Sequence, residues 1–276
     1  MSIEKFEGVY EARTPISHGS DEDFGMEQRL RTIEMVIEDD KGETRNEDIP
    51  VISGNGLRGY IRDLLAEHFL NTIDISTGDR LSYSLYSGGN LEKGTGKRRI
   101  NRKMIKSIRE NIPMLSLLGT AIGSEIISGK LKMGMLVPIS KETVNYTNLE
   151  SDKSVFEMID ETFYTRKDDL EGKKAKGKKQ AQQMKFDVQI LVPGTKLYHW
   201  MIVEHPTEIE LSCLGKAFEL FDQRPFVGGM SSRGHGKVDY EYNRELPKGD
   251  KYVEHLNDNK ESIKEYVDGL DEKLEG

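Results

Sequence analysis

A glycine-rich segment near the end of the chain, residues 227–238 with the sequence VGGMSSRGHGKV, is well suited to binding an anion. Glycine lets backbone amides approach a ligand closely, and the side chains of Ser231, Ser232, Arg233 and His235 add hydrogen-bond donors. We expect a phosphate-facing loop, although an ordinary glycine-rich turn before a final strand has the same composition. The glycine spacing matches neither the dinucleotide nor the mononucleotide loop fingerprint, so it predicts no NAD or nucleotide site.

A second set of donors belongs to the segment IPVISGNGLRGYIRDLLAEHFLNTI, which begins extended and becomes helical. Leucine, isoleucine and phenylalanine recur there at helical spacing and predict a buried stripe, which leaves Arg58 and Arg62 exposed one turn apart. Asn55 is the expected N-cap. Together with His18 and Ser20, which follow the first strand, these side chains can line one groove with the glycine-rich loop. The alternative for the arginines is a solvated helix face, and for Arg233 and His235 a turn packed on its own sheet.

Charge is unevenly distributed along the chain. The 276 residues include 40 Lys and Arg and 48 Asp and Glu, for a net charge of -8, which by itself argues against a nucleic-acid binder. However, the basic residues cluster at 93–109 and 173–179, and the acidic ones at 21–23, 38–40 and from 245 onward. This separation predicts one positive face able to meet phosphates. The candidate contacts within and beside the clusters are Arg98, Arg99, Arg102, Lys103, Arg166 and Lys167.

Several classes of protein are disfavoured. No apolar run approaches the roughly 20 residues that span a bilayer, and the N-terminus lacks a signal-peptide pattern, so we expect a cytoplasmic protein with no membrane partner. The single cysteine, Cys213, allows no disulfide framework and no cysteine zinc site. Because no metal-ligand spacing such as HExxH is present either, we expect no metal and no cofactor.

The order of elements predicts an α+β fold. Residues 3–13 and 28–37 read as two strands that pair, residues 130–139 and 197–204 as further strands, and 237–243 as a closing strand. The helices are the one that carries Arg58 and a second at 207–221, with Thr207 as cap and Glu210 in capping-box position. This order is compatible with a ferredoxin-like sheet backed by two helices.

The remaining segments read as inserts and a tail. Residues 74–112 show no clean period and read as an insertion that is flexible or ordered by a partner. Residues around 162–188 read as a hairpin with the lysine-rich run at its tip. The last 25 or so residues read as an exposed acidic helix.

Three segments, TPISHG, IPVISGNGLRGYIRDLL and FVGGMSSRGHGKV, together resemble the RAMP superfamily of CRISPR-associated proteins over about residues 5–242. The backbone subunit of class 1 effector complexes, of type IV or type I, is the most similar member. The resemblance implies a modified ferredoxin-like or RRM-like palm with an inserted finger region and a projecting thumb hairpin. The implied segments are 1–73 (palm), 74–112 (fingers), 113–149 (palm), 150–190 (thumb), 191–244 (palm completion with the glycine-rich loop) and 245–276 (acidic tail).

The resemblance also implies a function and partners. A backbone subunit polymerises head to tail along CRISPR guide RNA, supports pairing with a target DNA or RNA, and contacts other effector-complex subunits in antiviral defence. The basic and polar side chains named above would then hold the guide, and the chain would not be an enzyme. Phe163, Tyr164 and Met184 on the hairpin arms would wedge against bases or pack the hairpin onto the palm.

Two enzymatic alternatives stay open at this point. In type III complexes the backbone subunit cleaves target RNA with an aspartate in the loop after the first strand, and Asp21, Glu22 and Asp23 occupy that position here. A stand-alone guide-processing RAMP endonuclease would instead use a histidine. The histidines are His18, His68, His199, His205, His235 and His255.

Overall fold

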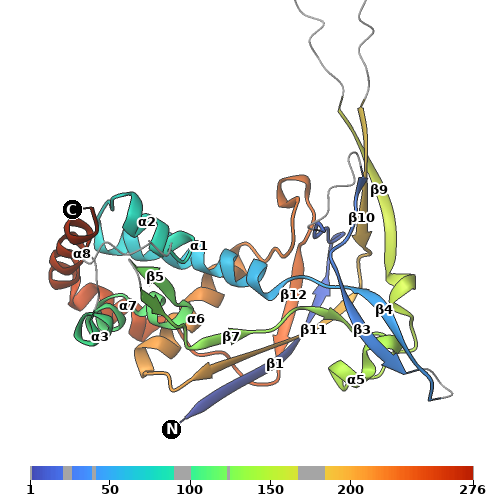
Figure 1. The fold of residues 1–276 in the computed structure, drawn as a ribbon, viewed down its shortest axis with the longest axis horizontal. Helices are drawn as coiled ribbons and strands as arrows, with labels where there is room; N and C mark the ends of the chain where they lie inside the picture. The colour runs from blue at the N-terminus through green and yellow to red at the C-terminus, as the bar shows by residue number, and fades with distance from the viewer. Residues whose placement is uncertain are drawn as a thin grey trace, which may run out of the picture.

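The computed structural model describes residues 2–20, 27–38, 42–89, 101–122, 125–166 and 184–275. Its centre is an antiparallel sheet with the strand order β12-β1-β11-β7, in which β8 also pairs with β11 (Figure 1). The strands are β1 (Ile3–Ala12), β7 (Leu131–Met133), β8 (Val137–Pro138), β11 (Lys196–Glu204) and β12 (Val238–Tyr242). The strand expected over residues 130–139 is thus two short strands separated by residues 134–136.

Two helices complete this sheet into the ferredoxin-like order βαββαβ. Helix α1 (Gly54–Ile73) connects β1 to β7 in the chain, and α6 (Glu208–Gln223) connects β11 to β12. Thr207 caps α6, where its side chain and that of Glu210 form the expected capping box. The α+β fold class with this palm is therefore confirmed.

The core lies between the palm sheet and its helices. Along β1 the residues alternate, with Phe6, Tyr10 and Ala12 buried on one side of the strand. The helices contribute their apolar stripes to the same cluster, from α1 Leu57, Ile61, Leu65 and Phe69, and from α6 Leu214, Phe218 and Phe221. The stripe predicted for the first helix is therefore buried as expected.

The segment between β1 and α1 differs from the sequence prediction. It contains β2 (Glu27–Gln28), β3 (Thr32–Glu38) and β4 (Thr44–Pro50), and β3 pairs with β4 over seven residue pairs. The expected pairing of residues 28–37 with the first strand is wrong, because β11 and β12 occupy both edges of β1. Periodicity identified the strand but could not identify its partner.

The segment after α1 also differs from the prediction. It contains α2 (Asp79–Tyr86), α3 (Arg102–Asn111), α4 (Pro113–Leu118), β5 (Thr120–Ile122) and β6 (Glu125–Ile127). Leu81, Leu85 and Ile108 are fully buried in the main core, so the described part of the insertion is folded without a partner. Two of its helices are short, and their few apolar residues gave too weak a period to be recognised.

The hairpin near residues 162–188 is confirmed. Strand β9 (Ile159–Arg166) pairs antiparallel with β10 (Met184–Leu191), and β2 adds parallel to β10. The hairpin projects from the palm beside β3 and β4 (Figure 1). Its base includes η2 (Lys141–Thr143), α5 (Val144–Thr147) and η3 (Val155–Met158), and Val155 joins Ile49, Val51 and Val137 in a second small core.

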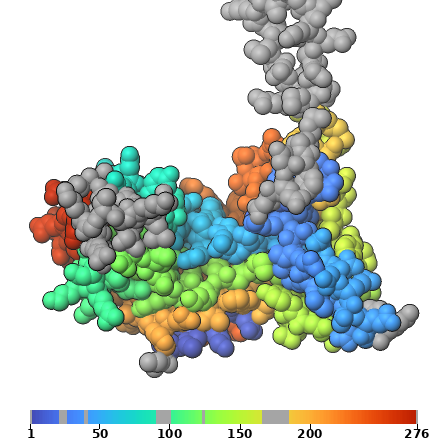
Figure 2. Space-filling view, viewed as in Figure 1, coloured from blue at the N-terminus to red at the C-terminus, as the bar shows by residue number. Residues whose placement is uncertain are grey.

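The acidic C-terminal segment is not an exposed helix. It forms α7 (Asp250–Asp258) and α8 (Lys260–Glu275), which pack beside α1, α2 and α6 at one end of the molecule (Figures 1 and 2). The buried side chains of these helices are Tyr252, Leu256, Ile263, Val267, Leu270 and Leu274. They recur every three or four residues, a pattern that the many acidic residues of the segment obscured. The division of the chain into segments otherwise stays a prediction.

Candidate nucleic-acid interface

The glycine loop, residues 227–237, adopts a conformation that requires glycine. Gly228, Gly234 and Gly236 have φ of 78°, 84° and 86°. A Cβ on Gly236 would lie 2.1 Å from the Val227 carbonyl oxygen, and one on Gly228 2.5 Å from the Ser17 carbonyl oxygen. The loop is therefore folded tightly on itself and on the segment that follows β1, with a single turn, η4 (Ser231–Arg233), at its tip.

Backbone hydrogen bonds attach the glycine loop to residues 15–17. The Gly229 amide donates to the Ser17 carbonyl at 2.6 Å, and the Gly236 amide donates to the Pro15 carbonyl at 2.8 Å. We expected the loop amides to face an anion, and for these two amides that expectation is wrong. The donors that the loop presents to solvent are the exposed side chains of Ser231, Ser232 and Arg233.

Tyr164 of β9 joins the thumb hairpin to the glycine loop. Its hydroxyl hydrogen-bonds to Nε2 of His235, and the Arg233 guanidinium lies 4.7 Å from the centre of its ring. His235 is only 4% exposed. Burial, reinforced by the positive charge of Arg233, lowers the pKa of His235, so its ring is neutral at pH 7. His235 therefore fixes the loop, while Arg233 is the charged group at the surface.

His18 connects the other side of the loop to the start of α1. Its Nε2 accepts a hydrogen bond from the Ser53 amide at 3.1 Å, and its carbonyl accepts one from the Arg31 amide at 2.7 Å. Ser20 continues the same segment, with its amide donating to the Arg29 carbonyl at 2.9 Å. Residues 15–20 thus lie between the glycine loop and α1, and they hold both in place.

The N-cap of α1 is Ser53 rather than Asn55. The Ser53 hydroxyl accepts from the Gly56 amide at 3.0 Å, and Asn55 lies exposed in the first helical turn. The prediction of Asn55 as cap is therefore wrong by two residues, because serine and asparagine both cap helices well. Asn55 remains available as a surface donor at the positive end of the helix.

Arg58 and Arg62 are not exposed on the helix surface. Arg62 is 7% exposed, and its Nη2 donates to the carbonyls of Leu118 at 3.0 Å and Gly119 at 2.9 Å. Arg58 also donates to the Leu118 carbonyl and is half-buried. Burial and the neighbouring Arg58 lower the pKa of Arg62 to about 10. The prediction of a solvated pair is wrong, because both guanidiniums bind carbonyls at the C-terminal end of α4.

The remaining basic candidates are not brought to the glycine loop. Arg102 and Lys103 are exposed in the first turn of α3, which lies at the far end of the molecule from β9 and β10 (Figure 1). Arg166 ends β9, where its backbone pairs with Met184. Arg98, Arg99 and Lys167 lie outside the described residues, as do Asp21, Glu22 and Asp23.

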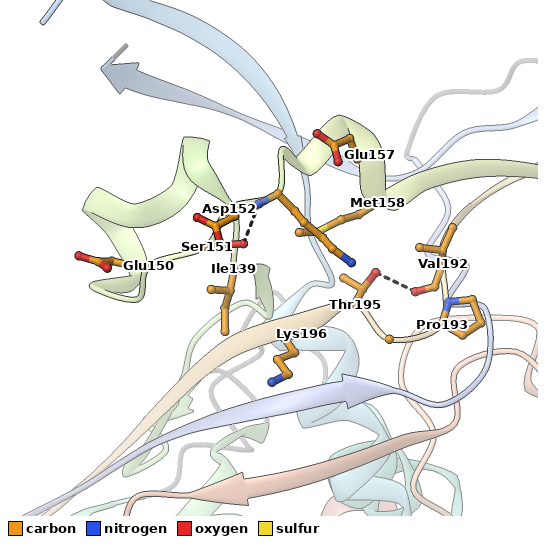
Figure 3. Close-up of a pocket in the computed structure, with 12 residues that line it drawn as sticks. Ile139, Glu150, Ser151, Asp152, Glu157, Met158, Val192, Pro193, Thr195 and Lys196 are labelled. Atoms are coloured by element: carbon orange, nitrogen blue, oxygen red, sulfur yellow. Dashed lines mark hydrogen bonds between the residues drawn. The ribbon is translucent and has the colours of Figure 1, made fainter. Parts of the chain in front are cut away.

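A cavity of about 400 Å³ lies at the base of the hairpin, and both apolar and charged residues line it (Figure 3). Met158, Val192 and Thr195 lie together on its wall, and Glu150 points outward. Within the described ranges, no three acidic, histidine or cysteine side chains converge as a metal site would require. No predicted site residue lines this cavity.

Comparisons with known proteins show what this chain is similar to. No model of a protein family and no curated protein matches the chain. A chain in the solved structure of a Type IV-B CRISPR complex superposes with a TM-score of 0.66 at 19% identity, over 89% of this chain and 93% of that chain. The two chains share one fold. Among the described residues, no helix is long and apolar enough to cross a membrane.

Sequence reasoning missed two contributors to this interface, Ser17 and Ser53, and left the role of a third, Tyr164, open. The Ser17 carbonyl accepts a hydrogen bond from the glycine loop, and the Ser53 hydroxyl caps α1. Tyr164 contacts Arg233 and His235. Tyr164 was expected to wedge against bases or to pack the hairpin on the palm, and it does pack on the glycine loop. Alternation along β9 separates it from its neighbour Phe163, which is 61% exposed.

Proposed function

We propose that this chain is the guide-RNA-binding backbone subunit of a multi-subunit CRISPR effector complex. The observation that carries the proposal is the fold shared with a chain of the Type IV-B complex across nearly its whole length. The interface supports it independently, because three motifs far apart in sequence meet at the start of α1. In this proposal the RNA backbone runs past Asn55 and the η4 turn, and copies add head to tail along the guide.

The chemistry of the interface suits a polyanion read without sequence preference. Ser231, Ser232 and Arg233 are exposed donors, and they are held by a loop that is anchored through glycine amides, His235 and Tyr164. Phosphate contacts of this kind position a strand, whereas base pairing carries the specificity. The exposed ring of Phe163, with the Lys185 ammonium 5.1 Å from its centre, suits contact with a base of the guide or target.

Multimer length on RNA tests the proposal. We expect the purified chain to form particles whose mass, measured by light scattering after size exclusion, increases in proportion to the length of the added RNA. One or two copies on every RNA, whatever its length, would instead indicate a guide-processing enzyme and overturn the backbone assignment. Electron microscopy of the same samples distinguishes a filament from irregular aggregates.

Salt dependence tests the position of the RNA. Replacing Arg233 with alanine should weaken binding and lower the slope of log affinity against log salt by about 0.7, the value for one lost single-strand phosphate contact. Lys251→Ala is the matched control, because Lys251 is an exposed cation that pairs with Glu208 in the helical layer. An unchanged slope for Arg233→Ala would place the strand elsewhere.

We further propose that the chain binds without cleaving. The type III alternative depends on Asp21 and Asp23, and a complementary target RNA on the assembled complex tests it directly. We expect the labelled target to stay intact with the parent protein. Cleavage by the parent that disappears in Asp21→Ala/Asp23→Ala would make the chain a ribonuclease.

A further inference from the structure

The palm sheet has a face directed away from α1 and α6. Phe6 and Tyr10 of β1 are buried in the core, so Glu7 and Val9 project from the other side of the strand. Strands β1 and β11 lie along the lower edge of the view in Figure 1, below α1. Tyr146 of α5 reaches over one corner of this face, edge-on to Tyr198 with ring centres 6.3 Å apart.

Aromatic and acidic side chains meet at the centre of this face. Cross-strand partners project from the same side of a sheet, and Val9 lies between Tyr198 on β11 and Glu241 on β12. Glu7 is opposite Trp200. Glu7 and Glu241 are exposed, and the other three are partly buried. We call these five residues the aromatic-acidic face.

Among the described residues, the two carboxylates at the centre form no ion pair, and neither does Lys5, the exposed cation two residues from Glu7 on the same side of β1. Arg13 pairs with both Glu11 and Asp239 at 2.6 Å, which compensates the acids at the end of β1. Glu7 and Glu241 form no such ion pair in the part of the chain described. The Glu7 carboxylate instead lies beside Tyr198, whose pKa is raised mainly by burial and further by Glu7.

The indole of Trp200 is accommodated by a glycine. A Cβ at Gly134 would lie 2.6 Å from the Trp200 ring, so only glycine lets the ring lie against the gap between β7 and β8. The ring is therefore held close to the strand with part of its surface exposed, opposite Glu7. This arrangement presents a flat π surface and negative charge together.

The aromatic-acidic face is better suited to binding lysine side chains than nucleic acid. Aromatic rings on an RRM-like sheet stack bases, but carboxylates beside them repel phosphates. A lysine ammonium, in contrast, is attracted both to a carboxylate and to an aromatic face. The lysine stem can cover an apolar residue such as Val9 while its charge reaches Glu7 or Glu241.

We propose that the aromatic-acidic face binds the lysine-rich segment 173–179 of a second copy of this chain. The segment KKAKGKK holds five lysines and no acidic residue, so its charge complements the face. We place the contact between two copies, because the described strands β9 and β10 extend away from β1 and β11 (Figure 1). The proposal rests on the proposed function for the assembly of copies, and it adds the surface at which they meet.

Trp200 provides a direct readout, because it is the single tryptophan of the chain. Titrating the full-length protein at low micromolar concentration with the peptide EGKKAKGKKQA, residues 171–181, should give a saturable change in tryptophan fluorescence. The same peptide with its five lysines replaced by glutamine should give no change. The double variant Glu7→Gln/Glu241→Gln should weaken binding of the lysine peptide at least fivefold. Glu254→Gln, which alters an exposed acid on α7, should bind like the parent.

The outcomes separate this proposal from the proposed function. A fluorescence change with oligouridine RNA and none with the lysine peptide would make the sheet face an RNA surface and overturn the inference. Equal binding of the peptide to the parent and the double variant would overturn it too. Loss of RNA-dependent multimers, in contrast, would contradict the proposed function while leaving peptide binding to the face intact.

Discussion

His199 is a histidine held neutral in the centre of the palm. It is fully buried, its Nδ1 hydrogen-bonds to the Tyr242 hydroxyl at 2.8 Å, and that hydroxyl bonds to Tyr10 at 2.9 Å. Burial lowers the pKa of His199 to about 3. The residue thus contributes to packing, and a charged imidazole would be strongly disfavoured at this position.

The stability of the fold should therefore fall in acid. Below pH 6.5 His199 is protonated in the unfolded chain but stays neutral in the folded protein. The free energy of unfolding therefore decreases as the pH falls from 6.5 towards 3. The slope approaches about 1.4 kcal/mol per pH unit, and the loss between pH 6.5 and 5 is about 1.6 kcal/mol. Urea denaturation at both pH values should show this loss in the parent and a smaller loss in His199→Phe. Identical pH dependence of the two proteins would contradict it.

A second prediction at the residue scale concerns the contribution of Arg62 to stability. Replacing it with methionine removes two hydrogen bonds to the Leu118 and Gly119 carbonyls, and these carbonyls are left without that donor in the interior. We expect the free energy of unfolding to fall by about 2–3 kcal/mol, the range for bonds to a charged group. Arg58→Met, at a half-buried position, should have a smaller effect. If Arg62→Met instead leaves stability unchanged and weakens RNA binding, its assigned role is wrong.

At the scale of elements, Gly234 and Gly236 of the glycine loop serve as a control and a test position. Gly234 and Gly236 both have positive φ, but a Cβ on Gly236 would clash with the Val227 carbonyl, whereas one on Gly234 meets nothing within 4 Å. Gly234→Ala should therefore cost only the conformational strain, about 1–2 kcal/mol. Gly236→Ala should lower the melting temperature further and also weaken RNA binding. Equal effects of the two variants would mean that the loop is not packed as described.

Elements also show where prediction from sequence succeeded. The helices that carry Arg58 and Thr207, and the hairpin β9–β10, were predicted with boundaries close to those observed, because period, caps and turn residues are local signals. The partner of β3 was predicted wrongly as β1, since pairing with either β1 or β4 satisfies the same alternation.

At the scale of the whole molecule, α7 and α8 close the core. Tyr252 and Leu256 are fully buried, and the Tyr252 amide donates to the Ser212 hydroxyl of α6 at 2.9 Å. Ending the chain after Asn243 would uncover the apolar surfaces of α1, α2 and α6. We expect this truncation to be largely insoluble or to melt at least 10 °C lower, as lost burial of several large side chains implies.

A soluble truncation with an unchanged melting temperature would restore the interpretation of an acidic tail. The control is Glu254→Lys/Asp258→Lys, which reverses two exposed charges of α7 without removing the helix. It should melt close to the parent, because surface charges contribute little to stability.

The sequence by itself determined the α+β class, the two palm helices and the glycine-rich segment, because these depend on residues close together in the chain. It also identified Ser231, Ser232 and Arg233 as donors of that segment, and the structure leaves all three exposed. Only the tertiary structure decided that Arg58 and Arg62 bind carbonyls of α4, that Tyr164 contacts the loop, and that the acidic segment completes the core. These outcomes depend on contacts between residues distant in sequence, and solvent exposure cannot be assigned to a charged side chain until its neighbours are known.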